Sequence, residues 1–154
     1  MTTTTDSGLD LAVVRTAAEL PDWLDLETLT SFLHESLKPY QDAPHDIRKG
    51  IDYALDDESP RGGFVVLASE GHELKGALVM LHTGMSGYIP ENLLLFVAVD
   101  PSTRGQGVGR RVIERALVET DGPVKLHVEY DNPAKRLYER IGFTSKYAEM
   151  RYNG

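Results

Sequence analysis

The stretch VDPSTRGQGVGRRVIE, residues 99–114, lies where an apolar run ends and a helical pattern begins. The run before it, NLLLFVAVD, is nearly continuous in apolar residues, which is typical of a central strand covered on both faces. A turn from such a strand into a helix exposes backbone N–H groups that lack helical partners, and the helix dipole adds partial positive charge there. Three glycines in this stretch let an anion approach the backbone closely. The turn therefore predicts a site for phosphate or pyrophosphate.

Two common phosphate-binding signatures do not fit this turn. The triphosphate-binding loop needs a lysine directly after its last glycine, and no lysine follows these glycines. The dinucleotide-binding fingerprint needs G-x-G-x-x-G, but its last position falls on Arg110 when counted from Gly105 and on Val112 when counted from Gly107. The anion site must therefore belong to another class, unless the glycines only form a tight turn.

The patterns on either side of this turn predict one mixed domain. Working outward, we expect the order β-α-α-β-β-β-α-β-α-β, which is an α/β (α+β mixed) fold with helices packed against a sheet. The strands are expected at 11–17, 62–70, 72–84 (the second arm of a hairpin that turns at 70–72), 92–100, 124–130 and 145–153, and the helices within 25–40, 45–57, 108–119 and 133–141. The expected domain spans residues 9–154 and follows a flexible N-terminal tail at 1–8.

Composition narrows the possible partners and cofactors. With 154 residues, 41% of them hydrophobic, the chain fits one globular domain, and its lack of cysteine excludes disulfides and thiolate sites. The formal net charge of −8 argues against nucleic acid or an anionic membrane as the main partner and favours a cationic one, although an acidic surface also serves solubility. The five histidines show no metal-ligand spacing, so no metal is expected. The chain shows no signal peptide and no span of about 20 apolar residues, so we expect a cytoplasmic protein.

Two motifs together resemble those of the GNAT superfamily of acyl-CoA-dependent N-acetyltransferases. Arg104, Gly107 and Gly109 form R-x-x-G-x-G after a V-x-V-x-P strand end, which is similar to the family's pyrophosphate loop. DNPAKRLYERIGF, residues 131–143, resembles the second family motif: an asparagine, a short helix carrying a tyrosine, and then Gly-Phe. The resemblance covers residues 93–150 in sequence and the whole chain in element order. It implies a GNAT-like fold with a central, largely antiparallel sheet of about six to seven strands and about four helices.

The resemblance implies acetyl-CoA as cosubstrate and assigns a role to each matching residue. The pantetheine arm would lie along the central strand like an extra strand, and the glycine-rich loop would wrap the pyrophosphate mainly through its N–H groups. Tyr138 would be the general acid that protonates the departing thiolate; otherwise it is a core tyrosine. The implied cofactor-binding residues are Val97, Ala98, Val99, Arg104, Gly105, Gln106, Gly107, Val108, Gly109, Arg110, Asn132 and Lys135.

The general base is left open by the sequence. An acceptor amine must lose its proton before it attacks a thioester, because the ammonium form has no lone pair. Aligned on Asn132, His127 occupies the place where relatives resembling peptide N-terminal acetyltransferases have a glutamate, so His127 is the first candidate base and Glu129 the second. Both residues also fit a solvated strand face. Further candidates are Glu91, His82 and a water relay.

The identity of the acceptor substrate is the property that the sequence predicts least well. Segments 33–46 and 83–92 lie where relatives recognise their substrates, and their acidic and aromatic residues suit a cationic amine, or simply a solvated surface. These residues are Glu35, Asp42, Asp46, Glu91, Tyr40 and Tyr88. We therefore expect an N-acetyltransferase that acts on a small primary amine by direct attack in a ternary complex. The alternatives are acetylation of a protein N-terminal or lysine amine, and a non-catalytic acyl-CoA-binding module. Edge pairing into a homodimer is a further possibility.

Overall fold

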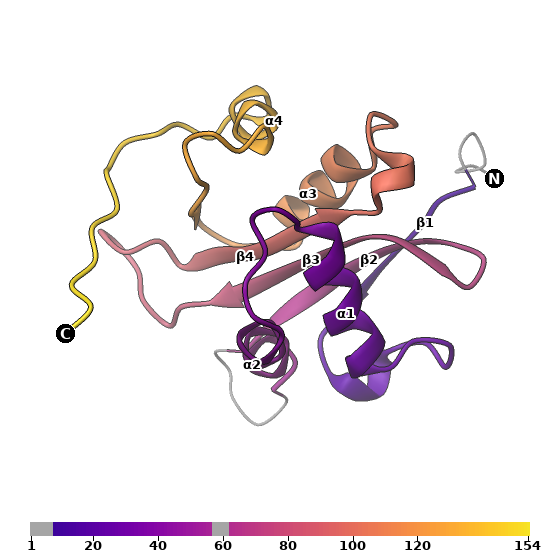
Figure 1. Cartoon of the computed structure of the whole chain (residues 1–154). Coiled ribbons are helices and arrows are strands. Elements are labelled where there is room, and N and C mark those ends of the chain that lie inside the picture. Colours follow the sequence, from indigo (N-terminus) through magenta and orange to yellow (C-terminus); the bar gives the residue numbers. More distant parts are fainter. Residues whose placement is uncertain (1–7, 57–61) are drawn as a thin grey trace.

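The structure is a computed structural model that describes residues 8–56 and 62–154. Its centre is a sheet, drawn in Figure 1, that has five strands. The strands follow one another across the sheet in chain order, the first four being antiparallel and the last parallel to its neighbour. They are β1 (Asp10–Val14), β2 (Gly63–Glu70), β3 (Glu73–His82), β4 (Asn92–Val99) and β5 (Val124–Leu126). Apart from residue 8, the predicted N-terminal tail lies outside the described residues.

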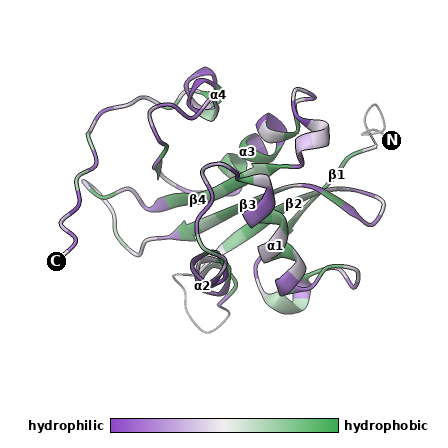
Figure 2. Cartoon of the chain, viewed as in Figure 1, coloured by the Kyte–Doolittle hydropathy of each residue, from purple (hydrophilic) through white to green (hydrophobic). Residues whose placement is uncertain are grey.

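Helices cover both faces of this sheet. Helices α1 (Leu26–Ser36) and α2 (Pro44–Ala54) pack on one face, and α3 (Val108–Val118) packs on the other together with α4 (Ala134–Ile141). Two short 3-10 turns, Ala17–Glu19 and Pro101–Thr103, complete the described elements. Figure 2 shows the apolar residues concentrated in the strands and the polar residues on the connections. No described helix is long and apolar enough to cross a membrane.

The predicted elements form for local reasons that the sequence already contains. The side chain of Asp25 accepts a 2.7 Å hydrogen bond from the backbone N–H of Thr28, which caps α1 and lowers the pKa of Asp25. Helix α2 begins with Pro44, whose missing N–H costs nothing in the first helical turn. The hairpin between β2 and β3 turns at Gly71 in a left-handed conformation (φ +59°). Both early helices and the hairpin are thus confirmed, with ends shifted by a few residues.

One irregularity in β4 decides where the sheet opens. Phe96 pairs with Val79 and Leu94 pairs with Met80, so Leu95 is an extra residue that forms a β-bulge. As a result Leu95 and Phe96 both face the core under α1 and α2. Gly50 of α2 makes room for them, because an added Cβ there would lie 2.5 Å from Leu95 Cδ2 and 3.1 Å from Phe96 Cε2.

Two sequence predictions about strands are wrong. The strand expected at 124–130 ends at Leu126, because β5 pairs with β4 only from Asn92 to Leu94, before the bulge. The strand expected at 145–153 lies outside the sheet and runs away from α4 as an extended segment (Figure 1). The described chain therefore has five strands in place of the expected six to seven, and the predicted order holds only up to α4.

Candidate active site

A large cleft lies where β4 and β5 separate. Its volume is about 1670 Å³, and it extends from the C-terminal half of β4 to the N-terminus of α3, the segment after β5 and α4. All of the predicted cofactor-binding and catalytic residues line this cleft except Gln106. The fold therefore brings together two motifs that lie more than 20 residues apart in the sequence.

The edge of β4 in this cleft presents unpaired backbone groups. The N–H of Asn92 donates to Pro123 O on the β5 side (3.3 Å), whereas the N–H of Asp100 donates to Lys75 O on the β3 side (2.8 Å). Successive N–H groups of a strand alternate between its two edges, so the extra residue in the bulge accounts for this change of side. The same alternation directs the N–H groups of Val97 and Val99 away from β3, into the cleft. β5 does not reach them, so this edge can receive an extended amide-bearing arm.

The glycine-rich loop at the end of β4 leaves room for an anion. Gly105 and Gly107 both have φ +83°, and a Cβ added to either would meet no atom within 4 Å. Gly107 caps α3 without any side-chain hydrogen bond, so the first N–H groups of this helix remain without intrahelical partners. Together with the helix dipole, they form a cradle of positive character that fits a pyrophosphate.

The basic side chains around the loop are held by neighbouring residues. Arg104 Nη2 donates a 2.6 Å hydrogen bond to the carbonyl of Ser36, the last residue of α1. Arg110 forms an ion pair of 2.9 Å with Glu114 one turn further along α3. Arg104 therefore fastens the loop to α1, and the loop's binding capacity lies chiefly in its backbone.

Tyr138 projects from α4 into the part of the cleft beside α3. Its side chain is 8% exposed and packs edge-on against Phe143, with ring centroids 5.8 Å apart. Burial raises the pKa of Tyr138 to about 12, so its hydroxyl stays protonated at neutral pH. No described residue is recorded as a hydrogen-bond partner of this hydroxyl, which leaves its proton free to be donated. Gly142 ends α4 with φ +127° and lets the N–H of Phe143 bond to Tyr138 O (3.0 Å), which explains the Gly-Phe of the motif.

Asn132 and Lys135 also have local partners. Asn132 Oδ1 accepts a 2.9 Å hydrogen bond from the backbone N–H of Ala134 and so helps to start α4. Lys135 Nζ lies 2.7 Å from Glu139 Oε2 on the same helix. Both residues line the cleft, so these contacts do not remove them from it.

The two candidate bases lie beyond the end of β5. His127 and Glu129 are exposed and line the cleft from its β5–α4 wall. Facing them is Tyr40, from the connection between α1 and α2, whose hydroxyl donates a 3.1 Å hydrogen bond to the carbonyl of Asp131. Burial raises the pKa of Tyr40, and the nearby carboxylates of Asp131 and Glu129 raise it further, so the phenol is a neutral donor.

Other predicted acceptor residues separate into two groups. Asp42 and Asp46 line the cleft with Tyr40, whereas Glu35, Tyr88, Glu91 and His82 do not. His82 Nδ1 lies 3.0 Å from Asn92 Oδ1 near the start of β4, and Glu91 packs over Gly122. Neither His82 nor Glu91 therefore reaches the cleft.

Three residues of the cleft wall were not predicted from the sequence. Tyr147, Glu149 and Arg151 line it, although their segment was expected to form a strand. Their alternate spacing was the available signal, since it places three polar or aromatic side chains on one side of an extended chain.

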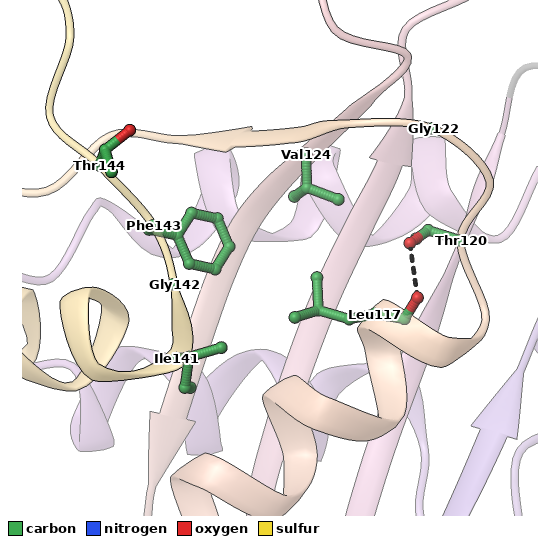
Figure 3. Close-up of a pocket in the computed structure, with 8 residues that line it drawn as sticks. All are labelled: Leu117, Thr120, Gly122, Val124, Ile141, Gly142, Phe143 and Thr144. Carbon is green, nitrogen blue, oxygen red and sulfur yellow. Dashed lines mark hydrogen bonds between the residues drawn. The ribbon is translucent and has the colours of Figure 1, made fainter.

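A smaller cavity of about 450 Å³ lies elsewhere (Figure 3). It is bounded by the end of α3, the start of β5 and the residues after α4, and its lining includes Leu117, Val124 and Phe143. None of the predicted site residues lines it. Among the described residues, no group of three or more His, Cys, Asp or Glu side chains could hold a metal ion in either cavity or elsewhere.

Residues 60–145 match the family model described as an acetyltransferase (GNAT) domain, which is more than half of the chain. The chain belongs to the GNAT acetyltransferase family. The sequence-based assignment to this family is thereby confirmed, and this GNAT chain is an acyltransferase. No curated protein sequence matches it.

Solved structures of GNAT proteins share the fold of this chain at low sequence identity. The aminoglycoside N-acetyltransferase AAC(6')-Iy, solved in complex with CoA, superposes with a TM-score of 0.68 at 13% identity over 95% of this chain and 94% of that one. A GNAT family protein from Streptococcus pneumoniae TIGR4 gives 0.68 at 16% identity, covering 94% and 98%. An aminoglycoside acetyltransferase from an uncultured soil metagenomic sample, in complex with sisomicin, gives 0.64 at 16% identity over 97% of each chain. These likenesses show the fold, and the CoA complex places a cofactor of the expected kind on that fold.

Proposed function

We propose that this GNAT protein transfers an acetyl group from acetyl-CoA to the primary amine of a small cationic molecule, by direct attack in a ternary complex. The observation that carries the proposal is the open edge of β4, which ends at the glycine-rich N-terminus of α3. This edge suits the amides of a pantetheine arm, and the loop suits a pyrophosphate. When bound, acetyl-CoA supplies the acetyl group as an activated thioester.

The residues after β5 would prepare the acceptor amine. A carboxylate or imidazole on this wall can accept the proton that the ammonium must lose, directly or through water. Glu129 lies close enough to the phenol of Tyr40, in the connection between α1 and α2, to raise its pKa, so Glu129 faces the acceptor region from the wall that follows β5. His127 lines the same wall and is the other candidate.

Tyr138 would act on the other product, the departing sulfur. Its raised pKa keeps the phenol protonated at neutral pH, so Tyr138 would donate a hydrogen bond to the departing sulfur. Because the ordinary thiol pKa of about 8.5 lies below that of Tyr138, full proton transfer is uphill, and we expect this hydrogen bond to contribute at the lower end of the usual range for acid catalysis.

Carboxylates on both walls of the acceptor region, rather than the charge of the whole cleft, support a cationic acceptor of limited size; the lining also includes Lys38 and Lys49. Asp42 and Asp46 line one wall, and Glu129 and Asp131 line the other, so a positive group between them is stabilised by both. The Tyr40–Asp131 hydrogen bond connects the two walls across the cleft, which favours a small amine over a long protein segment.

Calorimetric titration with acetyl-CoA, with CoA lacking its 3′-phosphate, and with ATP tests the cofactor assignment. We expect micromolar binding of acetyl-CoA and little response to ATP. Thiol release would then be measured with spermidine, sisomicin, free amino acids and a lysine-containing peptide as acceptors. Turnover restricted to the peptide would replace the small amine with a protein acceptor, and cofactor binding without turnover on any amine would favour a non-catalytic acyl-CoA-binding module.

A further inference from the structure

The connection between α1 and α2, residues 37–43, forms a strap beside the cleft, and three side-chain hydrogen bonds hold it. At its start, Arg104 Nη2 donates to the carbonyl of Ser36 (2.6 Å). At its end, the ring N–H of His34 donates from Nδ1 to the carbonyl of Asp42 (3.0 Å). In its middle, the Tyr40 hydroxyl donates to the carbonyl of Asp131 (3.1 Å). Only the Tyr40 contact reaches the opposite wall, formed by the segment between β5 and α4.

Of the strap residues, Leu37, next to the end of α1, packs against the apolar core, and the rest of the strap takes no part in it. Lys38, Pro39, Asp42 and Ala43 are exposed, and Tyr40 is half-buried. A segment with few buried contacts is held mainly by its hydrogen bonds and opens more readily than the core. The hydroxyl of Tyr40 therefore has a large share in fixing the distance between the strap and the opposite wall.

This contact also governs the acidic side chains of the acceptor region. Asp42 belongs to the strap and Asp46 lies in the first turn of α2, whereas Glu129 and Asp131 belong to the opposite wall. When the hydroxyl of Tyr40 is bonded to Asp131, the two acidic pairs are held across the cleft from each other. A cationic acceptor between them then experiences both fields at once.

We propose that Tyr40 is a positioning residue for acetyl transfer: its hydrogen bond to Asp131 holds the strap across the cleft and so forms the acceptor pocket. The proposal rests on the acetyltransferase function proposed above. The edge of β4 and the glycine-rich loop do not depend on this bond, so acetyl-CoA binding is independent of it. Tyr40 acts through the pocket's shape and touches no reacting atom.

The test compares Tyr40→Phe with the parent, because phenylalanine keeps the ring and removes only the hydroxyl. Tyr53→Phe is the matched control, since Tyr53 of α2 also lines the cleft but its hydroxyl has no hydrogen-bond partner among the described residues. Hydrogen exchange of peptides covering residues 37–43 and 127–131 measures the bond without any activity. Loss of one neutral hydrogen bond predicts exchange about two- to tenfold faster at both segments in Tyr40→Phe, and unchanged exchange in Tyr53→Phe.

Kinetics and calorimetry then separate positioning from catalysis. With spermidine and sisomicin as acceptors, we expect Tyr40→Phe to raise the amine KM about two- to tenfold, with kcat and the acetyl-CoA Kd within about twofold of the parent. Unchanged exchange in Tyr40→Phe overturns the proposal whatever the activity. A fall in kcat at unchanged KM also overturns it, because the hydroxyl would then act on the chemistry. If the parent acetylates neither amine, the proposed acceptor class fails, and the exchange result alone decides whether the bond holds the strap.

Discussion

Replacing Tyr138 with phenylalanine tests its proposed role as proton donor separately from its structural role. The hydroxyl is buried in a side chain that is 8% exposed, and no described residue is recorded as its hydrogen-bond partner. Removing it deletes one oxygen and keeps the edge-on contact with Phe143. At neutral pH we therefore expect the free energy of unfolding to stay within about 1 kcal/mol of the parent, or to rise slightly, because a buried hydroxyl without a partner is costly.

The raised pKa of Tyr138 also predicts that the stability of the parent and of Tyr138→Phe will differ in its dependence on pH at alkaline pH. The folded value is about 12 against an ordinary value of 10.0, so the difference of about 2 units corresponds to ~3 kcal/mol. Because burial disfavours the phenolate, the unfolded chain loses this proton first as the pH rises. The free energy of unfolding is therefore unaffected by this ionisation below pH 10 and decreases as the pH rises from about 10 to about 12. The parent should lose up to ~3 kcal/mol in that window that Tyr138→Phe does not lose.

Urea unfolding of both proteins at pH 8 and at pH 11.5 measures the difference, and subtracting the two proteins removes the titration of their other groups. Turnover of an acetylated amine at pH 8 should fall about 100-fold in Tyr138→Phe, with an unchanged acetyl-CoA Kd by calorimetry. Unchanged turnover at saturating substrate would assign the proton donor to water or to another group. Parallel loss of stability in both proteins from pH 8 to 11.5 would refute the buried, protonated state on which the assignment depends.

Four further substitutions test the loop, the bulge and the base. Gly107→Val should weaken acetyl-CoA binding in calorimetry, because its side chain would enter the open cradle, and its left-handed backbone should also cost about 1–2 kcal/mol in urea unfolding; equal affinity would exclude the loop as the site. Gly50→Ala should cost about 1–3 kcal/mol in urea unfolding and lower turnover, because its Cβ displaces Leu95 at the bulge; unchanged Tm and rate would show that the bulge adapts freely. Of His127→Gln and Glu129→Gln, the variant that removes the base should lose the acidic limb of the kcat/KM pH profile, and retention of that limb in both would assign the base to water or another group.

Local patterns predicted most of the elements but could not locate the opening of the sheet. The helical stripes, the Gly71 turn and the change from strand to helix after Val99 each depend on a few neighbouring residues, and they form as predicted. The bulge at Leu95 left no such signal, because Leu94, Leu95 and Phe96 are all apolar and fit either register. Where β5 leaves β4 is consequently a tertiary property, and the expected strand at 124–130 extended past it.

The C-terminal segment is a second case in which the local sequence pattern could not predict strand pairing. Residues 145–153 have the composition of a strand, but a strand also needs an edge with free N–H and C=O groups in the right register. The three-residue β5 offers only a short ladder, and the segment lies outside the sheet. Its residues Tyr147 and Glu149 instead line the cleft. Alternation thus predicted a strand where the structure has an unpaired segment outside the sheet.

Some residues of the two motifs stabilise the structure around the site, and others are available to contact a ligand. Arg104 bonds to the end of α1, Asn132 bonds to the start of α4, and Gly142 ends the helix that carries Tyr138. The surfaces left for a ligand are the backbone of β4 and of the loop, together with the Tyr138 hydroxyl. A backbone site tolerates changes in most side chains around it, which accounts for a shared fold at 13% to 16% identity with acetyltransferases of known structure. We propose that acceptor preference resides outside the motifs, in the strap and the acidic walls that Tyr40 joins.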